Sequence, residues 1–362
     1  MRYIFIVQGE GRGHLTQALA LSQMLRRAGH TVEEVLVGRC HGRVVPQFFI
    51  DKISAPVTLF DSPTIDYGRK GKRGSIFATV TNAISPLKLP LWRNSIDLIA
   101  EKIENSGADV MISFYEFMLG IVNFMHPIKK PIVCLGHQFM IEHPDFRLSR
   151  VRESSSMMLK LNNMVCSHGV TKKLALSFYE LPSSKSRRIE VVPPLLRSEL
   201  FDLQPHEGDY LLGYMLNPAY LDEVVKWKRA NPESIVHLFW DKQEAGEEDQ
   251  REHMDGLWLH RLNDEKFLNY MAGCRGYVTT AGFESVCEAL YLGKPTLMIP
   301  AHLEQQINAS DAMKVGAGMK ADRFNLSILE ESIKSYSADT ARFREWVESA
   351  EQRYLHALSN GL

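Results

Sequence analysis

The sequence predicts an α/β protein built from two doubly wound halves, each a parallel sheet with helices on both faces. Short apolar runs alternate with amphipathic helical patterns along most of the chain. A proline-containing stretch, VVPPLLRSEL at 191–200, interrupts the alternation near the middle. Each half also has a glycine-containing turn between a strand and a helix. Strands that alternate with helices favour parallel pairing, because each helix returns the chain across a face of the sheet.

The composition is that of a globular protein with a sizeable core. The chain has 362 residues, of which 45% are hydrophobic and 23% charged, enough for two domains. The net charge of -1 gives no indication of a nucleic-acid partner. Five cysteines are scattered without a CxxC pair, which indicates neither a disulfide framework nor a zinc site and favours a reducing compartment.

No segment is typical of targeting to or through a membrane. The first apolar run, Tyr3 to Val7, is too short for a signal core and leads directly into a glycine turn. No apolar run approaches the ~18 residues that a membrane-spanning helix needs. We therefore expect a cytoplasmic protein.

The first half begins with a strand at Tyr3–Val7 and a helix that ends at Arg27. Apolar or small residues recur at helical spacing from Leu15 to Leu25, and Gly29 occupies the position after the C-cap. A further helical stretch is expected after Arg43. The other expected strands are HTVEEVLVG (30–38), PVTLF (56–60), ADVMISF (108–114) and PIVCLGH (131–137).

Pro193 and Pro194 forbid a continuing helix or a central strand, so 191–200 is expected to be a linker. It separates a first domain, 1–195, from a second, 201–342. The second half repeats the alternation, and its acidic stretch DKQEAGEEDQRE (241–252) is expected to be a solvated loop. Its expected strands are DYLLGYML (209–216), SIVHLFW (234–240), LWLHRL (257–262), GYVTTAG (276–282) and KPTLMIP (294–300); its expected helices are LDEVVKWKRA (221–230), SVCEALYLG (285–293) and those from Asp264 and Asn325.

The turn GEGRGH, 9–14, joins the first strand to the first helix. Glycine permits positive φ angles, and its missing Cβ lets a ligand approach the backbone. The N–H groups at a helix N-terminus attract an anion. Gly9, Gly11 and Gly13 supply the glycines, but a dinucleotide fingerprint requires glycine where His14 stands, and no Walker A lysine follows.

His14 is the candidate catalytic residue of this turn. An imidazole with an ordinary pKa near ~6.5 suits a general base at neutral pH, and a helix N-terminus disfavours its protonated form. The alternative is a histidine that merely caps or packs against the helix.

A second cluster of candidates lies at 278–309, within VTTAGFESVCEALYLGKPTLMIPAHLEQQINA. Thr280 and Gly282 end a strand, and Ser285 begins the following helix, which predicts a phosphate site made of backbone N–H groups and hydroxyls. Glu288 lies on the same helix face as Ser285 and can bind the hydroxyls of a ribose. Glu304 and Gln305 follow the next strand and offer the paired donors and acceptors that sugar hydroxyls require. Solvated polar side chains are the alternative for each.

These residues resemble the GT-B glycosyltransferases, especially the family of the peptidoglycan N-acetylglucosaminyltransferase and its UDP-glucuronosyltransferase relatives. The Gly-His end of that family's N-terminal loop matches Gly13 and His14. Its pattern G-x-x-S-x-x-E-A-x-x-x-G-x-P, then P, then [DE]-Q-x-x-N-A, matches Gly282, Ser285, Glu288, Ala289, Gly293, Pro295, Pro300, Glu304, Gln305, Asn308 and Ala309.

The resemblance implies two Rossmann-like domains facing a cleft, with acceptor bound by the first and donor by the second. It implies that His14 is the catalytic base or stabilises charge at the donor. It also implies that Thr280 and Ser285 bind diphosphate, that Glu288 binds ribose, and that Glu304 and Gln305 bind the donor sugar. Thr280 departs from the family's usual histidine or arginine, and Arg261 is the candidate for the missing charge. A final segment at about 343–362 is expected to cross back onto the first domain, with Pro193–Pro194 as the hinge.

The expected reaction is transfer of a sugar from a nucleotide sugar, by resemblance a UDP-sugar, to an acceptor hydroxyl. No Asp-x-Asp follows a strand, so neither a metal nor another cofactor is expected. The acceptor is expected to be lipid-linked or a glycan, with peripheral contact to the inner membrane surface, because basic residues precede apolar ones at 66–92. The alternative for this segment is a mobile basic loop followed by a core helix. The alternatives are a non-hydrolysing epimerase, a non-catalytic nucleotide-sugar binding protein and, less favoured, a dehydrogenase.

Overall fold

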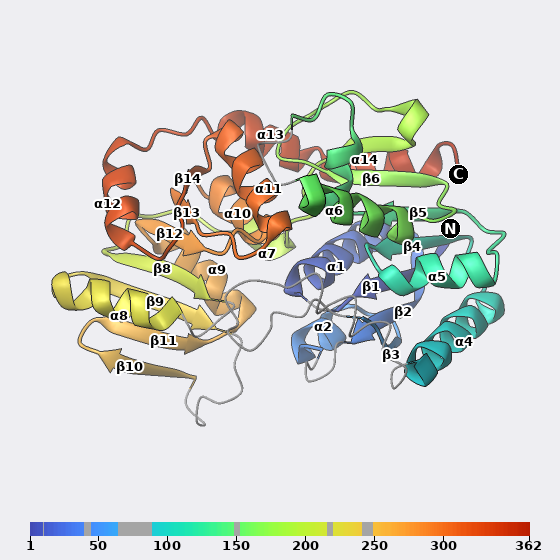
Figure 1. Cartoon of the computed structure of the whole chain (residues 1–362), viewed down its shortest axis with the longest axis horizontal. Helices are drawn as coiled ribbons and strands as arrows, with labels where there is room; N and C mark the ends of the chain where they lie inside the picture. The colour runs from blue at the N-terminus through green and yellow to red at the C-terminus, as the bar shows by residue number, and fades with distance from the viewer. Residues whose placement is uncertain (10, 40–44, 64–88, 148–152, 216–219, 241–248) are drawn as a thin grey trace. The chain divides into compact units, whose positions relative to one another are not determined.

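The structure is a computed structural model that describes residues 1–9, 11–39, 45–63, 89–147, 153–215, 220–240 and 249–362 (Figure 1). These residues form two compact units. The described residues up to Arg197, together with Trp346–Leu362, make the first unit, and Ser198–Glu345 makes the second. The boundary after the first unit's main segment therefore lies between Arg197 and Ser198, within the stretch 191–200 that contains Pro193 and Pro194.

The first unit contains a seven-stranded sheet in which all neighbours are parallel. The strand order is β3-β2-β1-β4-β5-β6-β7. The central strands are almost completely buried, as strands with helices on both faces must be. The strands are β1 (Arg2–Gln8), β2 (Thr31–Arg39), β3 (Val57–Asp61), β4 (Val110–Phe114), β5 (Ile132–Leu135), β6 (Lys172–Leu176) and β7 (Ile189–Val192).

Helices connect these strands and cover the sheet. α1 ends where the sequence predicts, with Gly29 at a φ of 77° after the C-cap Ala28. α5 packs against both α4 and α6. The elements are α1 (Arg12–Arg27), α2 (Gln47–Lys52), α4 (Leu89–Asn105), α5 (Phe117–Met125), the 3-10 helix η1 (His137–Glu142), α6 (Glu153–Cys166) and the 3-10 helix η2 (Lys185–Arg187).

The C-terminal segment belongs to the first unit by its hydrogen bonds. Trp346 Nε1 donates to the Ser177 carbonyl at 2.9 Å, and Tyr354 Oη donates to the Pro193 carbonyl at 2.9 Å. Lys172 Nζ donates to the Ala357 carbonyl at 2.8 Å. These contacts fix α14 (Ala350–Ser359) against β7.

The second unit repeats the design with a seven-stranded sheet of order β10-β11-β9-β8-β12-β13-β14. All pairs are parallel except β10 with β11. The strands are β8 (Tyr210–Met215), β9 (Ile235–Trp240), β10 (Gln250–Met254), β11 (Leu257–Arg261), β12 (Gly276–Thr279), β13 (Thr296–Met298) and β14 (Gly318–Lys320). The helices are α7 (Ser198–Phe201), α8 (Leu221–Ala230), α9 (Asp264–Gly273), α10 (Phe283–Tyr291), α11 (Leu303–Ala312), the 3-10 helix η4 (Met313–Val315), α12 (Leu326–Ser335) and α13 (Ala341–Glu348). α13 crosses the boundary between the units.

The prediction of two doubly wound α/β halves is confirmed, with local corrections. The end of the stretch expected to be a solvated loop forms the antiparallel edge strand β10, reversed through Gly256 at a φ of 67°. Its first four residues are exposed, so the apolar alternation that would predict a strand is absent. Val191 and Val192 belong to β7 rather than to the linker. Within the described part of the chain no helix is long and apolar enough to cross a membrane.

Two histidines pair inside the second unit. His237 Nδ1 lies 2.8 Å from His260 Nε2, so one ring donates and the other accepts. Burial lowers the pKa of His237 to about 4 and that of His260 to about 3. Protonating both rings would place two donors face to face, which reinforces the preference for neutral rings.

This pair predicts that the second unit loses stability in acid. Unfolded histidines titrate near ~6.5, so below that pH the unfolded chain binds protons that the folded pair does not, and stability falls from about pH 6.5 towards pH 4. His260→Gln should flatten that slope in urea unfolding measured across this range. The matched change His253→Gln, at an exposed position on β10, should leave the slope unchanged. Identical slopes for His260→Gln and the unmodified protein would contradict the assignment.

Candidate functional site

The first unit gathers its candidate residues at the carboxyl ends of β1 and β4. The chain adds β2 and β3 on one side of β1, and then β4 to β7 on the other. Ligands of open α/β sheets bind at such a reversal of strand order. α1 begins there at the N-cap Gly11, whose φ of -125° is ordinary and which has no side chain to cap the helix.

The glycines of the turn serve different purposes. Gly9 donates its N–H to the Gly38 carbonyl at 2.9 Å, and a Cβ on Gly9 would lie 2.5 Å from that oxygen. Gly9 is therefore required for packing against β2. A Cβ on Gly11 would meet nothing within 4 Å, so Gly11 leaves open space beside the N-terminus of α1. Gly13 lies in the first turn of α1, and Glu10 is outside the described residues.

His14 is partly buried in the first turn of α1. Its Nδ1 lies 3.2 Å from Gln17 Oε1. An amide oxygen only accepts, so Nδ1 carries the proton and Nε2 keeps a lone pair. Burial lowers the pKa of His14 to about 4, against a smaller opposing effect of the Gln17 hydrogen bond. The ring is therefore neutral at physiological pH.

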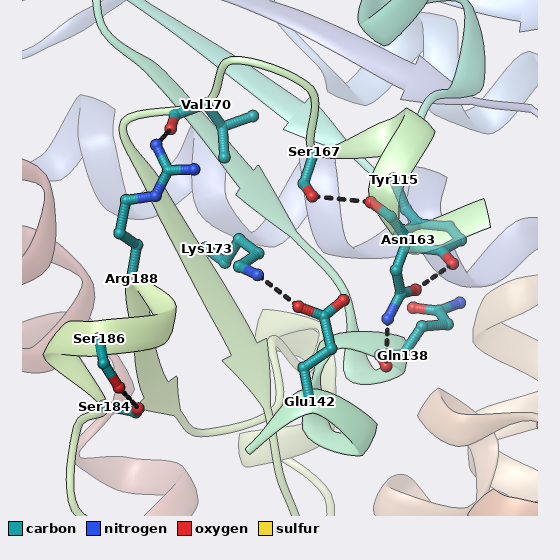
Figure 2. A network of polar contacts seen from close by, with 10 residues as sticks. All are labelled: Tyr115, Gln138, Glu142, Asn163, Ser167, Val170, Lys173, Ser184, Ser186 and Arg188. Carbon is teal, nitrogen blue, oxygen red and sulfur yellow. Dashed lines mark hydrogen bonds and ion pairs between the residues drawn. The ribbon is translucent and has the colours of Figure 1, made fainter. Parts of the chain in front are cut away.

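Tyr115 is a neighbour of His14 that the sequence analysis did not identify. The two rings are nearly parallel, at 19°, with centroids 6.1 Å apart. Tyr115 follows β4 with a φ of 56°, and its hydroxyl donates to Asn163 Oδ1 at 2.5 Å (Figure 2). Its place directly after the apolar run ADVMISF was the available signal. A strained backbone at the carboxyl end of a central strand is typical of functional sites.

Glu116 was also not identified. It is fully buried, caps α5 by accepting the Met118 N–H at 3.0 Å, and accepts the Ser62 hydroxyl at 2.6 Å. A Cβ on Gly38 would lie 2.5 Å from its Oε2. The end of β2 therefore needs glycine to admit this carboxylate beneath the turn region.

The second unit has its own reversal of strand order, between β8 and β12. After β12 come Thr280, which is buried, and Ala281, whose φ is 64°. Gly282 is then the N-cap of α10 and, like Gly11, offers no side-chain cap. The first N–H groups of α10 therefore lie at the place where ligands of such sheets bind.

Ser285 and Glu288 differ in accessibility. Ser285 is partly exposed in the first turn of α10, and its Oγ donates to the Gly282 carbonyl at 3.3 Å. Glu288 is 1% exposed. Together with Glu284 and Asp311 it raises the pKa of the buried Cys287 thiol, which burial itself raises most. Glu288 lies one helical turn after Ser285 and is buried, whereas the sequence predicts that both side chains share an accessible face.

Gln305 joins the two loops that contain the candidates. Its Oε1 accepts the Ala301 N–H at 2.9 Å, and its Nε2 donates to Thr280 Oγ1 at 3.4 Å. Asn308 Nδ2 donates to the Ala281 carbonyl at 3.3 Å. The amides of the Gln-x-x-Asn pattern therefore hold the strained turn in place. Glu304 is partly exposed in the first turn of α11.

His302 is a further residue that the sequence analysis missed at this edge. It is the N-cap of α11, and burial lowers its pKa to about 4. It stands two residues before Glu304 in the loop after β13, which was the available signal.

Arg261 is not brought to this cluster. It is the last, exposed residue of β11. Because β9 and β8 lie between β11 and β12, the strand spacing puts these strands roughly 14 Å apart. Of the expected acceptor segment 66–92, residues 66–88 lie outside the described residues. Cys134, Cys166, Cys274 and Cys287 are free and buried, and among described residues no group of His, Cys, Asp or Glu is arranged to hold a metal ion.

Two doubly wound sheets, each with a helix that starts from a glycine at the reversal of strand order, have the GT-B architecture. The particular family follows from the sequence. A model of glycosyl transferase family 1 matches residues 1–337, and the chain belongs to that family. An uncharacterized glycosyltransferase of Methanosarcina acetivorans is 24% identical over 346 residues, which cover 88% of this chain and 83% of that protein.

Solved structures share the fold over the whole chain. The glycotransferase of kitacinnamycin aligns with a TM-score of 0.63 at 13% identity, covering 100% of this chain and 98% of that one. LpCGTa, solved in complex with UDP, gives 0.63 at 15% identity and covers 99% and 98%. The spinosyn rhamnosyltransferase SpnG, complexed with thymidine diphosphate, gives 0.63 at 11% identity and covers 99% and 100%. The predicted resemblance and GT-B fold are confirmed, and the enzyme is a glycosyltransferase rather than a dehydrogenase or a non-catalytic protein.

Gln305→Leu should lower the free energy of unfolding by about 1–3 kcal/mol, because it leaves the Ala301 N–H and the Thr280 hydroxyl without their partner. Gln306→Leu makes the same chemical change at the next, partly exposed residue and should cost less than about 0.5 kcal/mol. Urea unfolding of both variants measures the difference. Equal costs would show that Gln305 does not hold the loops together.

The environment of His14 predicts its titration. In the free enzyme labelled at histidine, the NMR signal that disappears in His14→Gln should titrate with a midpoint near 4. Gln17→Leu should lower the midpoint further, because the hydrogen bond to Gln17 favours the protonated ring. A midpoint near the ordinary ~6.5 would mean that water reaches the ring.

Proposed function

We propose that the enzyme transfers a sugar from a nucleotide sugar, most favourably a UDP-sugar, to an acceptor hydroxyl. The observation that carries this proposal is the uncapped N-terminus of α10, directly after β12 at the reversal of strand order. Such a terminus binds the anionic diphosphate through backbone N–H groups. The similar structures solved with UDP and thymidine diphosphate support a nucleotide donor.

In the proposed donor site, Gly282 and Ser285 bind the diphosphate. The Ser285 hydroxyl is partly exposed and its hydrogen bond to the Gly282 carbonyl is long, at 3.3 Å, so it can turn towards a phosphate oxygen. Glu304, also partly exposed, binds hydroxyls of the donor sugar. Thr280 and Gln305 shape the loop that holds these groups, since their polar atoms bond to each other.

We propose that Glu288 binds the ribose once donor binding has made its side chain accessible. Because the side chain is 1% exposed, donor binding must open a path to it. Arg261 would reach the diphosphate only by crossing two strands, which makes it the weakest of the proposed donor residues.

His14 is the proposed general base. With Nδ1 donating to Gln17, the lone pair on Nε2 accepts the proton of the acceptor hydroxyl as that oxygen attacks the anomeric carbon. The bond to the diphosphate breaks, and the leaving negative charge is stabilised at the start of α10. A neutral histidine of low pKa is fully available as an acceptor but is a weak base, so it takes the proton only once bond formation has made the hydroxyl acidic.

The acceptor, the cofactor requirement and the cellular location complete the proposal. We assign acceptor binding to the first unit, with a lipid-linked or glycan acceptor, and donor binding to the second. The reaction needs no metal ion or other cofactor, because the helix N-terminus stabilises the leaving group. The enzyme works in the cytoplasm, in peripheral contact with the membrane.

Calorimetric titration with UDP, GDP, TDP and NAD tests the donor site. UDP should bind selectively. Ser285→Ala, at a partly exposed position, should weaken binding while keeping the thermal unfolding midpoint, and Glu288→Gln should also weaken binding. Binding of none of these nucleotides would overturn the proposal.

Turnover separates binding from chemistry. His14→Asn should retain UDP affinity and lose about 10²–10⁴-fold in kcat with a UDP-sugar and a productive acceptor. His253→Asn makes the same chemical change at an exposed position of β10, and this control should keep kcat. Consumption of the UDP-sugar without any acceptor and with isomerisation of the sugar would indicate an epimerase instead.

A further inference from the structure

The first unit contains a basic cavity of about 490 Å³, bordered by the end of η1, the end of α6, the turn from α6 to β6 and the residues before β7. Its lining contains four cationic side chains and one carboxylate. The cations are Lys160, Lys173, Arg187 and Arg188, and the carboxylate is that of Glu142. The lining contains neither His14 nor Tyr115, so the cavity is separate from the turn at the carboxyl ends of β1 and β4.

The positive charge of the cavity is only partly compensated. Lys173 Nζ pairs with Glu142 Oε2 at 2.5 Å. Arg188 Nη1 donates to the Val170 carbonyl at 2.6 Å, which fixes the guanidinium but does not neutralise it. Lys160 and Arg187 are exposed. The cavity therefore has an excess of positive charge and suits an anionic group.

An apolar surface borders the cavity on α6 and α5. Met157, Leu161 and Met164 are 69%, 47% and 61% exposed, and their i, i+4, i+7 spacing puts them on one face of α6. At the end of α5, Phe124 is 72% exposed and Met125 54%. Large apolar side chains gathered in this way on a solvent-exposed surface mark an interaction site.

Two contacts make the cavity and the apolar residues one surface. Met164 and Lys160 of α6 themselves line the cavity. His168, another lining residue, packs edge-on against Phe124 with ring centroids 5.5 Å apart. We call this the α5–α6 surface; it comprises Phe124, Met125, Met157, Lys160, Leu161, Met164, His168, Arg187 and Arg188.

We propose that the α5–α6 surface docks on an anionic lipid bilayer, with lipid phosphates in the basic cavity and the apolar side chains at the level of the acyl chains. Charge complementarity favours this occupant, because excess cations next to exposed apolar groups match anionic headgroups above hydrocarbon. Lys160 can bury its stem beside Met157 and Met164 while its ammonium reaches a phosphate. This inference rests on the membrane contact in the proposed function and assigns that contact to the α5–α6 surface. It does not depend on the donor site.

Vesicle co-sedimentation tests this proposal with the full-length protein. The protein should bind phosphatidylcholine vesicles that contain phosphatidylglycerol and should bind pure phosphatidylcholine at least about tenfold more weakly. Lys160→Glu with Arg187→Glu should reduce the partition coefficient at least about tenfold, and so should Met157→Gln, Leu161→Gln and Met164→Gln combined.

Matched changes in the second unit serve as controls. Lys226→Glu with Arg229→Glu alters two exposed cations of α8, and Met313→Gln with Met319→Gln alters two exposed methionines. Both should keep binding at the level of the unmodified protein. UDP titration of every variant separates this test from that of the donor site, because loss of vesicle binding with intact UDP binding concerns the docking surface alone.

Three outcomes would overturn the proposal. The first is absence of binding to the anionic vesicles, or equal binding to neutral ones. The second is calorimetric binding of inorganic phosphate without vesicle binding, which would make the cavity a site for a free anion. The third is a dimer in gel filtration that the triple glutamine variant dissociates, which would assign the apolar residues to a second copy of the chain.

Discussion

The point at which each sheet reverses its strand order is the constraint on which both candidate sites depend. Right-handed connections place helices on one face while strands are added in one direction, and on the other face after the reversal. No connection then crosses the carboxyl ends of the two strands that flank the reversal, β1 and β4 in one unit and β8 and β12 in the other. α1 and α10 both start there from a glycine. The open backbone at these places is thus a result of topology.

Each unit stores backbone strain beside this opening. Tyr115 follows β4 with a φ of 56°, and Ala281 follows β12 and Thr280 with a φ of 64°. A non-glycine residue in this conformation costs about 1–2 kcal/mol. Neighbouring amides hold both residues, with Asn163 accepting from the Tyr115 hydroxyl and Asn308 donating to the Ala281 carbonyl. Buried side chains thus stabilise the conformations that direct the site residues.

Much of the fold could be predicted from the sequence because its strands are buried on both faces and its helices are periodic. The predicted helix LDEVVKWKRA begins and ends at the same residues as α8, and Gly29 and Gly293 both follow helix ends at positive φ. β10 could not be predicted, since an exposed edge strand has no apolar alternation. For the candidate sites, sequence spacing selected His14 and residues within 280–305 but not Tyr115. The contact between Tyr115 and His14 joins two residues about a hundred positions apart, which the pairing of β1 with β4 brings together.

Helix α6 connects the candidate site and the proposed docking surface of the first unit through its periodicity. Its inner face holds Tyr115, because Asn163 accepts from the tyrosine hydroxyl and Cys166 Sγ donates to the tyrosine carbonyl at 3.6 Å. Its outer face presents Met157, Leu161 and Met164. The two sets of residues are interspersed between Met157 and Cys166, but helical spacing points them in different directions. A substitution on the outer face can therefore change docking without touching the residues that support His14, whereas a shift of the whole helix would reach both.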